Sequence, residues 1–359
     1  MIFYIFVIVL ISFVCFLFKT KSIKNTKKKI ILTIILSIII FITGFRGVNV
    51  GNDTISYVSF FKVLSNDSID ILEVNFFEKG FILYNVIINK IFSDYRALLL
   101  ISSTLISIPI FLEIYKKSYN IWLSTMLYIN LMFFFNSMNI MRQFIALSIV
   151  FCFLKYVEQR KFFKFLFGVL LASTFHQTAI IAIVYYFIYD KKMNLKHFFI
   201  LLFTSFVIFI NIETIFYYYT FLFPKRYIVY EQRLNDINIA SILDLIVSIC
   251  FFILSLLLFK TKIKKIEDKD NNINFYINAT FVSVLINILA VKLNVLNRIS
   301  IYFSIFNILL IPNVLSYIKN SKTRNIIITI IFLLTCMYAY IILKYRPEWY
   351  NAIPYTIQI

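Results

Sequence analysis

Long apolar stretches recur along this chain, and they restrict its fold more than any other feature. Runs of about 15–22 mostly apolar residues alternate with short charged stretches over all 359 residues. A run of this length crosses a bilayer as an α-helix, whereas membrane strands are shorter and alternate in polarity. The mean hydropathy of +0.86 agrees with burial in lipid. The sequence therefore predicts an all-α, polytopic integral membrane protein.

The apolar runs predict about twelve transmembrane helices in a single polytopic domain, residues 1–359. Residues 80–93 are short and carry two asparagines and a lysine, so they predict an amphipathic helix in the membrane interface. This helix falls in one long loop, 46–96, and a second long loop covers 215–239. The predicted spans are 2–18, 30–45, 97–114, 121–137, 142–157, 162–175, 177–189, 198–214, 240–259, 273–291, 299–318 and 325–343.

Positive charge orients these spans. A net charge of +19 would suggest nucleic-acid binding in a soluble protein. In a membrane protein it is better explained by lysines gathering in cytoplasmic loops, so no nucleic-acid partner is expected. With both termini outside, twelve crossings place most of the 36 Lys and Arg in cytoplasmic loops. The loops 46–96 and 215–239 then face the outside, as extracytoplasmic loops.

Cysteine and histidine indicate no metal or redox centre. The four cysteines lie inside apolar runs without a CxxC spacing, which is typical of small packing residues. The chain has two histidines, which excludes a histidine-rich metal site. No cofactor and no metal are expected.

The stretch GFRGVNVGNDTISY, residues 44–57, ends the second predicted span with an unusual polar sequence. Arg46 stands at the helix end, and Asp53 and Tyr57 follow two further glycines that permit sharp backbone turns. These side chains are candidates for contact with a sugar or a phosphate. The alternative is an arginine that snorkels to the membrane surface above a tight loop.

A second candidate lies in NSMNIMRQFIA, residues 136–146, where Arg142 and Gln143 begin a helix at the outer surface. Free backbone N–H groups at a helix start together with a guanidinium group form an anion site, and phosphate is the obvious ligand. The alternative is an arginine at a lipid headgroup.

His176, in STFHQTA, lies between two apolar segments of about 14 residues, which reach only about 21 Å as helices. This is short for a hydrocarbon core of about 30 Å, so His176 is expected at a break below the outer surface. A neutral imidazole there can accept a proton. The alternative is a histidine that hydrogen-bonds a neighbouring helix.

Further polar and aromatic side chains share the outer face, and three arginines on that face suit a pyrophosphate leaving group. Tyrosine and tryptophan near the C-terminus could stack on sugars or belong to an interfacial aromatic belt. The additional candidates are Glu78, Arg298, Tyr302 and Tyr355.

In this order the residues resemble the EpsG family of bacterial polysaccharide polymerases, related in role to Wzy-type O-antigen and capsule polymerases. The resemblance covers nearly the whole chain; each motif is short, and their order and spacing carry the match. The matching residues are Arg46, Gly51, Asp53, Tyr57, Glu78, Gly80, Arg142, Gln143, Ala146, His176, Arg298, Tyr302, Pro354 and Tyr355.

The resemblance implies a metal-independent glycosyltransferase in the bacterial cytoplasmic (inner) membrane, with its active site facing outside. Its donor and acceptor would be oligosaccharide repeat units on undecaprenyl diphosphate, polymerised into capsule, O-antigen or exopolysaccharide. Membrane lipid, a flippase and a chain-length regulator are the further partners expected.

On this interpretation the catalytic residues are His176, Arg142, Arg298 and Asp53. Arginines hold the donor diphosphate, and His176 is the expected general base, with Asp53 and Glu78 as alternatives. The predicted substrate-binding residues are Arg46, Tyr57, Glu78, Gln143, Tyr302 and Tyr355.

Two other functions fit a polytopic membrane protein. A flippase for lipid-linked oligosaccharides would need charged residues in mid-membrane, whereas the predicted mid-span positions are almost all apolar. A membrane acyltransferase that modifies glycans would take its acyl donor from the cytoplasm, where the predicted loops are short.

Overall fold

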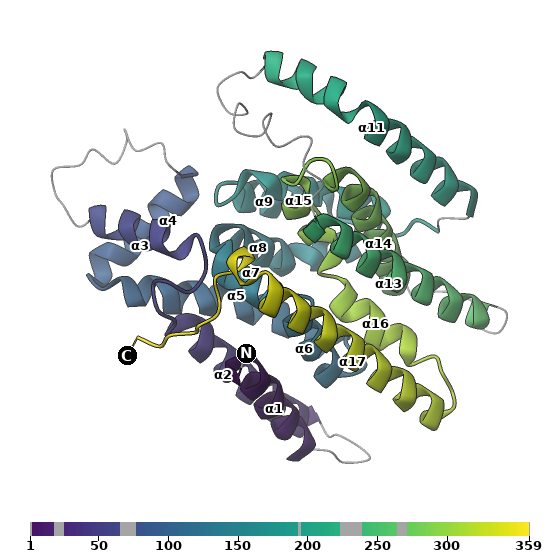
Figure 1. Ribbon diagram of the computed structural model, residues 1–359, viewed down its shortest axis with the longest axis horizontal. Coiled ribbons are helices and arrows are strands. Elements are labelled where there is room, and N and C mark those ends of the chain that lie inside the picture. Colours follow the sequence, from purple (N-terminus) through teal and green to yellow (C-terminus); the bar gives the residue numbers. More distant parts are fainter. Residues whose placement is uncertain are drawn as a thin grey trace. The chain divides into compact units, whose positions relative to one another are not determined.

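Helices make up the computed structural model, which describes residues 2–17, 25–64, 77–192, 195–222, 239–263 and 271–358 (Figure 1). Within these ranges no strand forms, and the only β-type pairing is an isolated antiparallel bridge between Arg46 and Ile357. The all-α prediction is therefore confirmed.

The chain divides into two compact units, each described here by itself. The first unit, Met1–Ile183 with Ile318–Ile359, contains α1 (Ile2–Leu17), α2 (Asn25–Gly44), α3 (Thr54–Val63), α4 (Lys79–Ile91), α5 (Tyr95–Lys117), α6 (Ile121–Asn130), α7 (Phe133–Asn139), α8 (Met141–Glu158), α9 (Phe162–Ser173), η1 (Gln177–Ile183), α17 (Ser321–Tyr345) and η2 (Pro347–Trp349). The second unit, Val184–Tyr317, contains α10 (Val184–Ile188), α11 (Leu195–Leu222), α13 (Ile239–Ile263), α14 (Asn271–Ala290), α15 (Leu296–Ser304) and α16 (Asn307–Leu315). The single polytopic domain stays a prediction.

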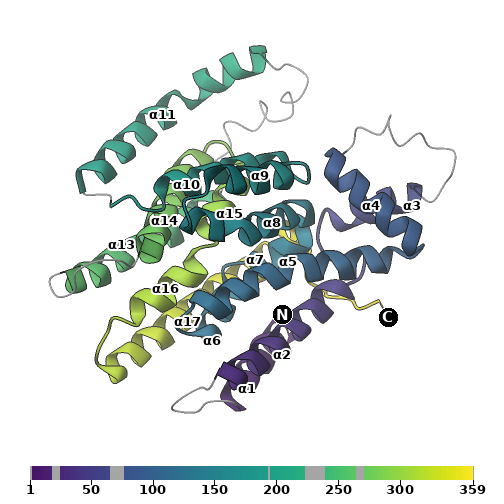
Figure 2. The same ribbon diagram turned by 180° about the vertical axis from the view of Figure 1, so that it is seen from behind.

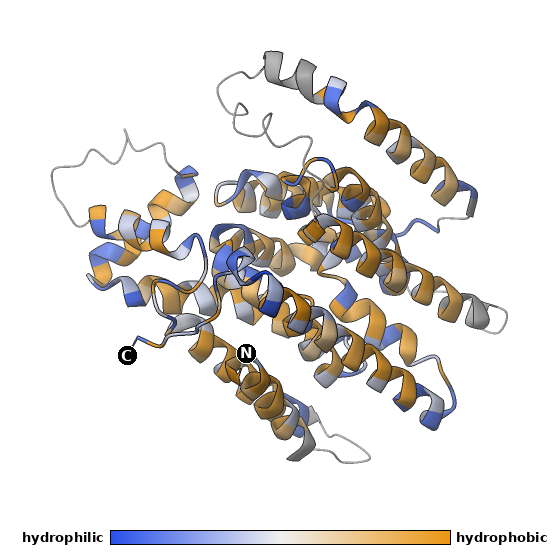
Figure 3. Cartoon of the chain, in the orientation of Figure 1, coloured by the Kyte–Doolittle hydropathy of each residue, from blue (hydrophilic) through white to orange (hydrophobic). Residues whose placement is uncertain are grey.

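Six helical segments in the described residues are long and apolar enough to cross a membrane, and a seventh is the bent pair α6–α7. The multi-pass character is thus supported, but the count of twelve is not confirmed. One reason is that some predicted spans are short helices, such as α9 with its 12 residues. The cartoon in Figure 3, coloured by hydropathy, shows hydrophobic residues along much of the length of these helices. The six segments are Tyr95–Lys117, Lys196–Ile215, Ile239–Leu258, Asn272–Ala290, Leu296–Leu315 and Ser321–Tyr345.

The predicted short helix at 80–93 is present as α4, which buries Phe81 and Ile88 and exposes Leu83 and Ile91. Its amphipathic character and its location in the membrane interface stay predictions. The predicted loop 46–96 also contains α3. The predicted loop 215–239 begins inside α11, which continues to Leu222, and residues 223–238 lie outside the described part.

Polar caps and one backbone break set the helix limits in the first unit. The side chains of Asp94, Asn120 and Asn320 accept backbone N–H hydrogen bonds at the starts of α5, α6 and α17, which satisfies donors that a helix leaves free. Between α6 and α7, Met132 adopts a φ of +66°, and the two helices bend by 52°. The break turns α7 toward the start of α8.

α8 packs against both α5 and α9, and α2 packs against α5, so these helices form the centre of the first unit (Figure 2). The inner face of α8 buries Phe144, Leu147 and Phe151 among its neighbours. Burial of large apolar side chains at this centre fixes the N-terminal end of α8, where the polar candidates lie.

Asn130, at the end of α6, joins three helices in the apolar interior. Its Oδ1 accepts from the hydroxyl of Tyr4 in α1 at 3.0 Å, and its Nδ2 donates to the hydroxyl of Thr335 in α17 at 3.1 Å. Asn130 is fully buried. Such bonds hold helices together where water cannot replace them.

We expect Asn130→Ala to lower the free energy of unfolding by about 1–2 kcal/mol, because Tyr4 and Thr335 then lose a partner. Thermal unfolding of the purified protein in detergent measures this. Asn211→Ala is the matched control, since that exposed amide bonds to Val207 of its own helix. Equal midpoints for the two variants would contradict the prediction.

Candidate active site

The first element of the site is the start of α4. Glu78 is the N-cap residue of this helix, in an extended backbone conformation. Two residues later, the backbone N–H of Gly80 donates to the carbonyl of Thr174 at 2.9 Å. A Cβ on Gly80 would lie 2.2 Å from Oγ1 of Thr174. Glycine therefore lets α4 approach the turn after α9, which brings Glu78 beside that turn.

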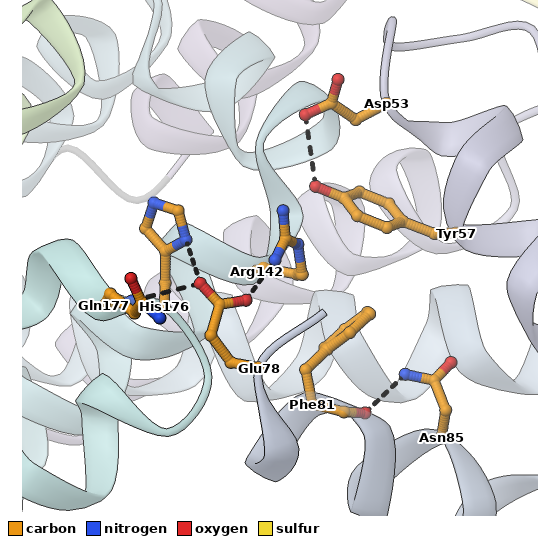
Figure 4. A network of polar contacts seen from close by, with 8 residues as sticks. All are labelled: Asp53, Tyr57, Glu78, Phe81, Asn85, Arg142, His176 and Gln177. Carbon is orange, nitrogen blue, oxygen red and sulfur yellow. Dashed lines mark hydrogen bonds and ion pairs between the residues drawn. The ribbon is translucent and has the colours of Figure 1, made fainter. Parts of the chain in front are cut away.

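The carboxylate of Glu78 bridges two other segments (Figure 4). Its Oε2 pairs with Nη1 of Arg142, and its Oε1 lies 3.3 Å from Nδ1 of His176. The same Oε1 accepts from the backbone N–H of Gln177 at 3.3 Å. Three predicted site residues from α4, α8 and the α9–η1 turn thus meet at one carboxylate.

Arg142 is the second residue of α8, directly after the short turn that ends α7. Aromatic rings surround its guanidinium group, whose central carbon lies 4.4 Å from the ring centre of Phe77, 5.8 Å from Phe81 and 5.9 Å from Tyr57. Cation–π contacts of this kind gain strength where water is excluded. The rings therefore hold the charge in place and keep it partly dry.

The three ionisable side chains are largely enclosed, with 14% of Glu78, 18% of Arg142 and 13% of His176 exposed. Burial alone would raise the pKa of Glu78, but its contact with His176 and the positive charge of Arg142 outweigh that effect and lower the pKa to about 2. Glu78 is therefore a carboxylate at neutral pH.

Three nitrogens in this cluster are buried without a hydrogen-bond partner among the described residues. They are Nε of Arg142 and both ring nitrogens of His176, of which Nδ1 lies 3.3 Å from Oε1 of Glu78. Buried polar atoms are rarely left unsatisfied, and an exception within a charged cluster points to a ligand or a reacting group. The contact of His176 Nδ1 with Glu78 is also poorly aligned for a hydrogen bond in this state, as catalytic contacts often are before substrate binds.

Asp53 and Tyr57 lie on the other side of Arg142 (Figure 4). The hydroxyl of Tyr57 donates to Oδ2 of Asp53 at 3.3 Å, one turn apart on α3. Tyr57 is buried, whereas Asp53 is partly exposed. This pair brings a second carboxylate to the same cluster.

Of the remaining candidates, three belong to the first unit and two to the second. Arg46 is 2% exposed and donates to backbone carbonyls, and Tyr355 donates to the carbonyl of Ile42 at the end of α2. Gln143, the residue after Arg142, is buried. Arg298 and Tyr302 belong to α15 of the second unit, and their substrate contacts stay predictions.

Sequence reasoning did not identify the backbone N–H of Gln177 or the rings of Phe77 and Phe81. The run FFEKGF, residues 76–81, contained a usable signal, since it places aromatic residues on both sides of a charged one. The described residues contain no cluster of three His, Cys, Asp or Glu able to hold a metal. Independence from metal stays a prediction.

Comparisons with known proteins agree with the resemblance seen in the sequence. No curated protein and no solved structure matches the chain. The sequence model of the EpsG family matches residues 29–357, nearly the whole chain. Members of this family are Wzy-like polysaccharide polymerases. The chain therefore belongs to the EpsG family.

Proposed function

We propose that this protein joins oligosaccharide repeat units carried on undecaprenyl diphosphate into a capsule, O-antigen or exopolysaccharide chain. The reaction is a glycosyl transfer at the outer face of the cytoplasmic membrane. The cluster of Glu78, Arg142 and His176, with three buried nitrogens that have no hydrogen-bond partner among the described residues, is the observation that carries the proposal. A cation and a base side by side suit the departure of an anion and the activation of a hydroxyl group.

The proposed location of the reaction, outside the cytoplasm, indicates which carrier holds the glycosyl donor. Nucleotide sugars are not available outside the cytoplasm, so a glycosyl donor there must be activated by a lipid. The leaving group is then a lipid diphosphate, which an arginine fork binds through parallel N–H···O bonds. Arg142 has five N–H donors, and Glu78 takes one of the two on Nη1. The others remain for phosphate oxygens.

The reaction uses few groups. His176 Nε2 takes the proton from a hydroxyl of the acceptor sugar, and that oxygen forms a bond to the anomeric carbon of the donor. The bond from the anomeric carbon to the diphosphate oxygen breaks, and its electron pair leaves with the lipid diphosphate. Arg142 stabilises the charge that develops on this leaving group. No metal is needed for these steps, and none is proposed.

Glu78 is best assigned as the residue that orients His176. A carboxylate with a pKa of about 2 is a weak base at neutral pH. Bound at Nδ1, it would fix the imidazole tautomer and leave Nε2 free to accept a proton. Asp53 is then the alternative base.

A strain lacking the gene distinguishes the candidate functions. We expect single repeat units on undecaprenyl diphosphate, accessible from outside, and no polymer. Repeat units trapped on the cytoplasmic side would instead indicate a flippase. Polymer of normal length that lacks a substituent would indicate an acyltransferase. A flippase and a chain-length regulator are the proposed partners of the polymerase.

We expect Arg142→Ala to reduce polymer formation by about 10²–10³-fold, because the leaving group loses its principal positive charge. Gel analysis of surface polysaccharide, normalised to the amount of protein in the membrane, measures this. Arg96→Ala is the matched control, since Arg96 is half exposed and pairs with Asp94. Normal polymer from Arg142→Ala would rule out its diphosphate role.

We expect His176→Ala to lower the rate of transfer by about 10²–10⁴-fold, since the acceptor hydroxyl loses its base. The measurement is the initial rate of transfer in membranes supplied with repeat units extracted from the deletion strain. His197→Ala, which changes the chain's other histidine in the exposed first turn of α11, is the control. A near-normal rate would make His176 structural.

Glu78 should also make stability depend on pH. Its folded-state pKa of about 2 lies below the ordinary value of 4.5, so the ionised form stabilises the fold above about pH 4.5. This contribution is lost as the pH falls toward 2. We expect the wild type to unfold at a higher temperature than Glu78→Gln at neutral pH, with the difference shrinking below about pH 4.5.

Thermal unfolding in detergent across this pH range tests the expectation. Glu348→Gln serves as the control, because Glu348 is exposed and lies 3.6 Å from the equally exposed Arg346. A difference between wild type and Glu78→Gln that stays constant with pH would contradict the role of the charge.

A further inference from the structure

The corner between α7 and α8 is held from one side by residues 46–54. The carbonyl of Met138, near the end of α7, accepts from Nη2 of Arg46 at 3.3 Å and from the hydroxyl of Thr54 at 3.3 Å. Gly51, with a φ of +92°, lies so close that a Cβ would be 2.8 Å from this carbonyl. Arg142 lies four residues after Met138. Contacts that hold the corner therefore also hold the start of α8.

Arg46 contacts the protein through both terminal nitrogens. Its Nη1 donates to the carbonyl of Thr43, and its Nη2 also lies 3.7 Å from Sδ of Met141, the residue before Arg142. Arg46 is 2% exposed. A guanidinium group buried in this way costs free energy unless its donors are satisfied; here both terminal nitrogens donate, whereas Nε has no partner among the described residues. Arg46 therefore contacts the corner rather than the outer surface.

The C-terminal segment, residues 346–358, lies along the same loop. The backbone N–H of Gly47 donates to Thr356 at 2.8 Å, and that of Gln358 donates to Phe45 at 2.9 Å. Further along, the N–H of Gly51 donates to Asn351 at 3.0 Å. In Figure 1 this segment passes the end of α2 in yellow. The pairing fixes both ends of the stretch that carries Arg46.

Two asparagine side chains connect this segment to the corner. Nδ2 of Asn52 donates to the carbonyls of Glu348 and Trp349 at 3.0 Å each. Nδ2 of Asn139, the last residue of α7, donates to the same carbonyl of Trp349 at 3.2 Å. One carbonyl of the C-terminal segment therefore joins the loop and the end of α7, three residues before Arg142.

We infer that Arg46 and the C-terminal segment are positioning elements for Arg142. They hold the α7–α8 corner so that the guanidinium of Arg142 lies where the diphosphate leaving group develops charge. This inference rests on the proposed function of Arg142. It gives Arg46 a role without substrate contact, in place of the sugar or phosphate contact predicted from sequence.

A positioning role has a kinetic signature. Displacement of a catalytic group by about 1 Å can cost about 10²-fold in rate, since the group is then misplaced in the transition state. Substrate binding through other contacts is changed less. Loss of the contacts that hold the α7–α8 corner should therefore lower kcat with little change in KM. Loss of a direct contact to bound substrate would instead raise KM.

The test compares two asparagines of one loop. Asn52→Ala removes both bonds to the C-terminal segment. Asn49→Ala is the matched control, because its side chain is exposed and makes no hydrogen bond among the described residues. Purified variants are assayed with repeat units on undecaprenyl diphosphate, extracted from the deletion strain. We expect Asn52→Ala to lower kcat about 10-fold with KM nearly unchanged, and Asn49→Ala to match the wild type.

Two variants of Arg46 extend the comparison. Arg46→Gln should lower kcat about 10²-fold, and Arg46→Lys should recover part of this loss, since an ammonium group can still donate to a backbone carbonyl. Hydrogen exchange provides a readout that does not depend on activity. The backbone amides of residues 138–142 should exchange faster in Asn52→Ala than in Asn49→Ala, because the corner is less restrained.

The outcomes separate this inference from the proposed function. If Arg142→Ala is inactive while Asn52→Ala and Arg46→Gln keep the wild-type kcat, the positioning role is overturned and the polymerase site stands. A raised KM with unchanged kcat, or unchanged exchange at residues 138–142, also overturns it. If Arg142→Ala is fully active, the proposed function fails, whatever the result for Asn52→Ala and Arg46→Gln.

Discussion

The bridge made by one carboxylate, Glu78, is the interaction on which the candidate site depends. Its two oxygens face Arg142 of α8 and His176 of the α9–η1 turn, and a largely enclosed arginine would be costly without such a partner. The bridge requires α4 to approach the α9–η1 turn, which the missing side chain of Gly80 permits. The polar contacts of Glu78 therefore depend on the packing of α4 against the α9–η1 turn, which Gly80 permits.

Interrupted helices give these polar groups their place in an otherwise apolar chain. The α6–α7 bend, the α7–α8 corner and the α9–η1 turn each end a helix before it reaches an ordinary membrane length. Irregular backbone in a membrane protein needs internal hydrogen-bond partners. At the α7–α8 corner Arg46 and Thr54 donate to the carbonyl of Met138, and the carbonyl of Trp349 accepts from the side chain of Asn139.

The sequence was sufficient to predict the helical class, the family and the residues Glu78, Arg142 and His176, because unusual polar residues stand out among apolar runs. It could not show that these three meet at one carboxylate, since contacts across about 100 residues depend on packing. It also could not separate Arg46, which is buried, from Arg142, which is not, because both follow apolar runs. The lengths of the apolar runs predicted the break at His176, but they did not predict the α6–α7 bend, and the number of spans was not confirmed.

The first unit is discontinuous in sequence, since residues 184–317 form the second unit before the chain returns with α17. During synthesis, the loop that carries Arg46 leaves the ribosome long before its hydrogen-bond partners at 346–358. While residues 184–317 are being synthesised, the α7–α8 corner therefore lacks its hydrogen bonds with residues 346–358. The proposed positioning of Arg142 would therefore be complete only late in biogenesis.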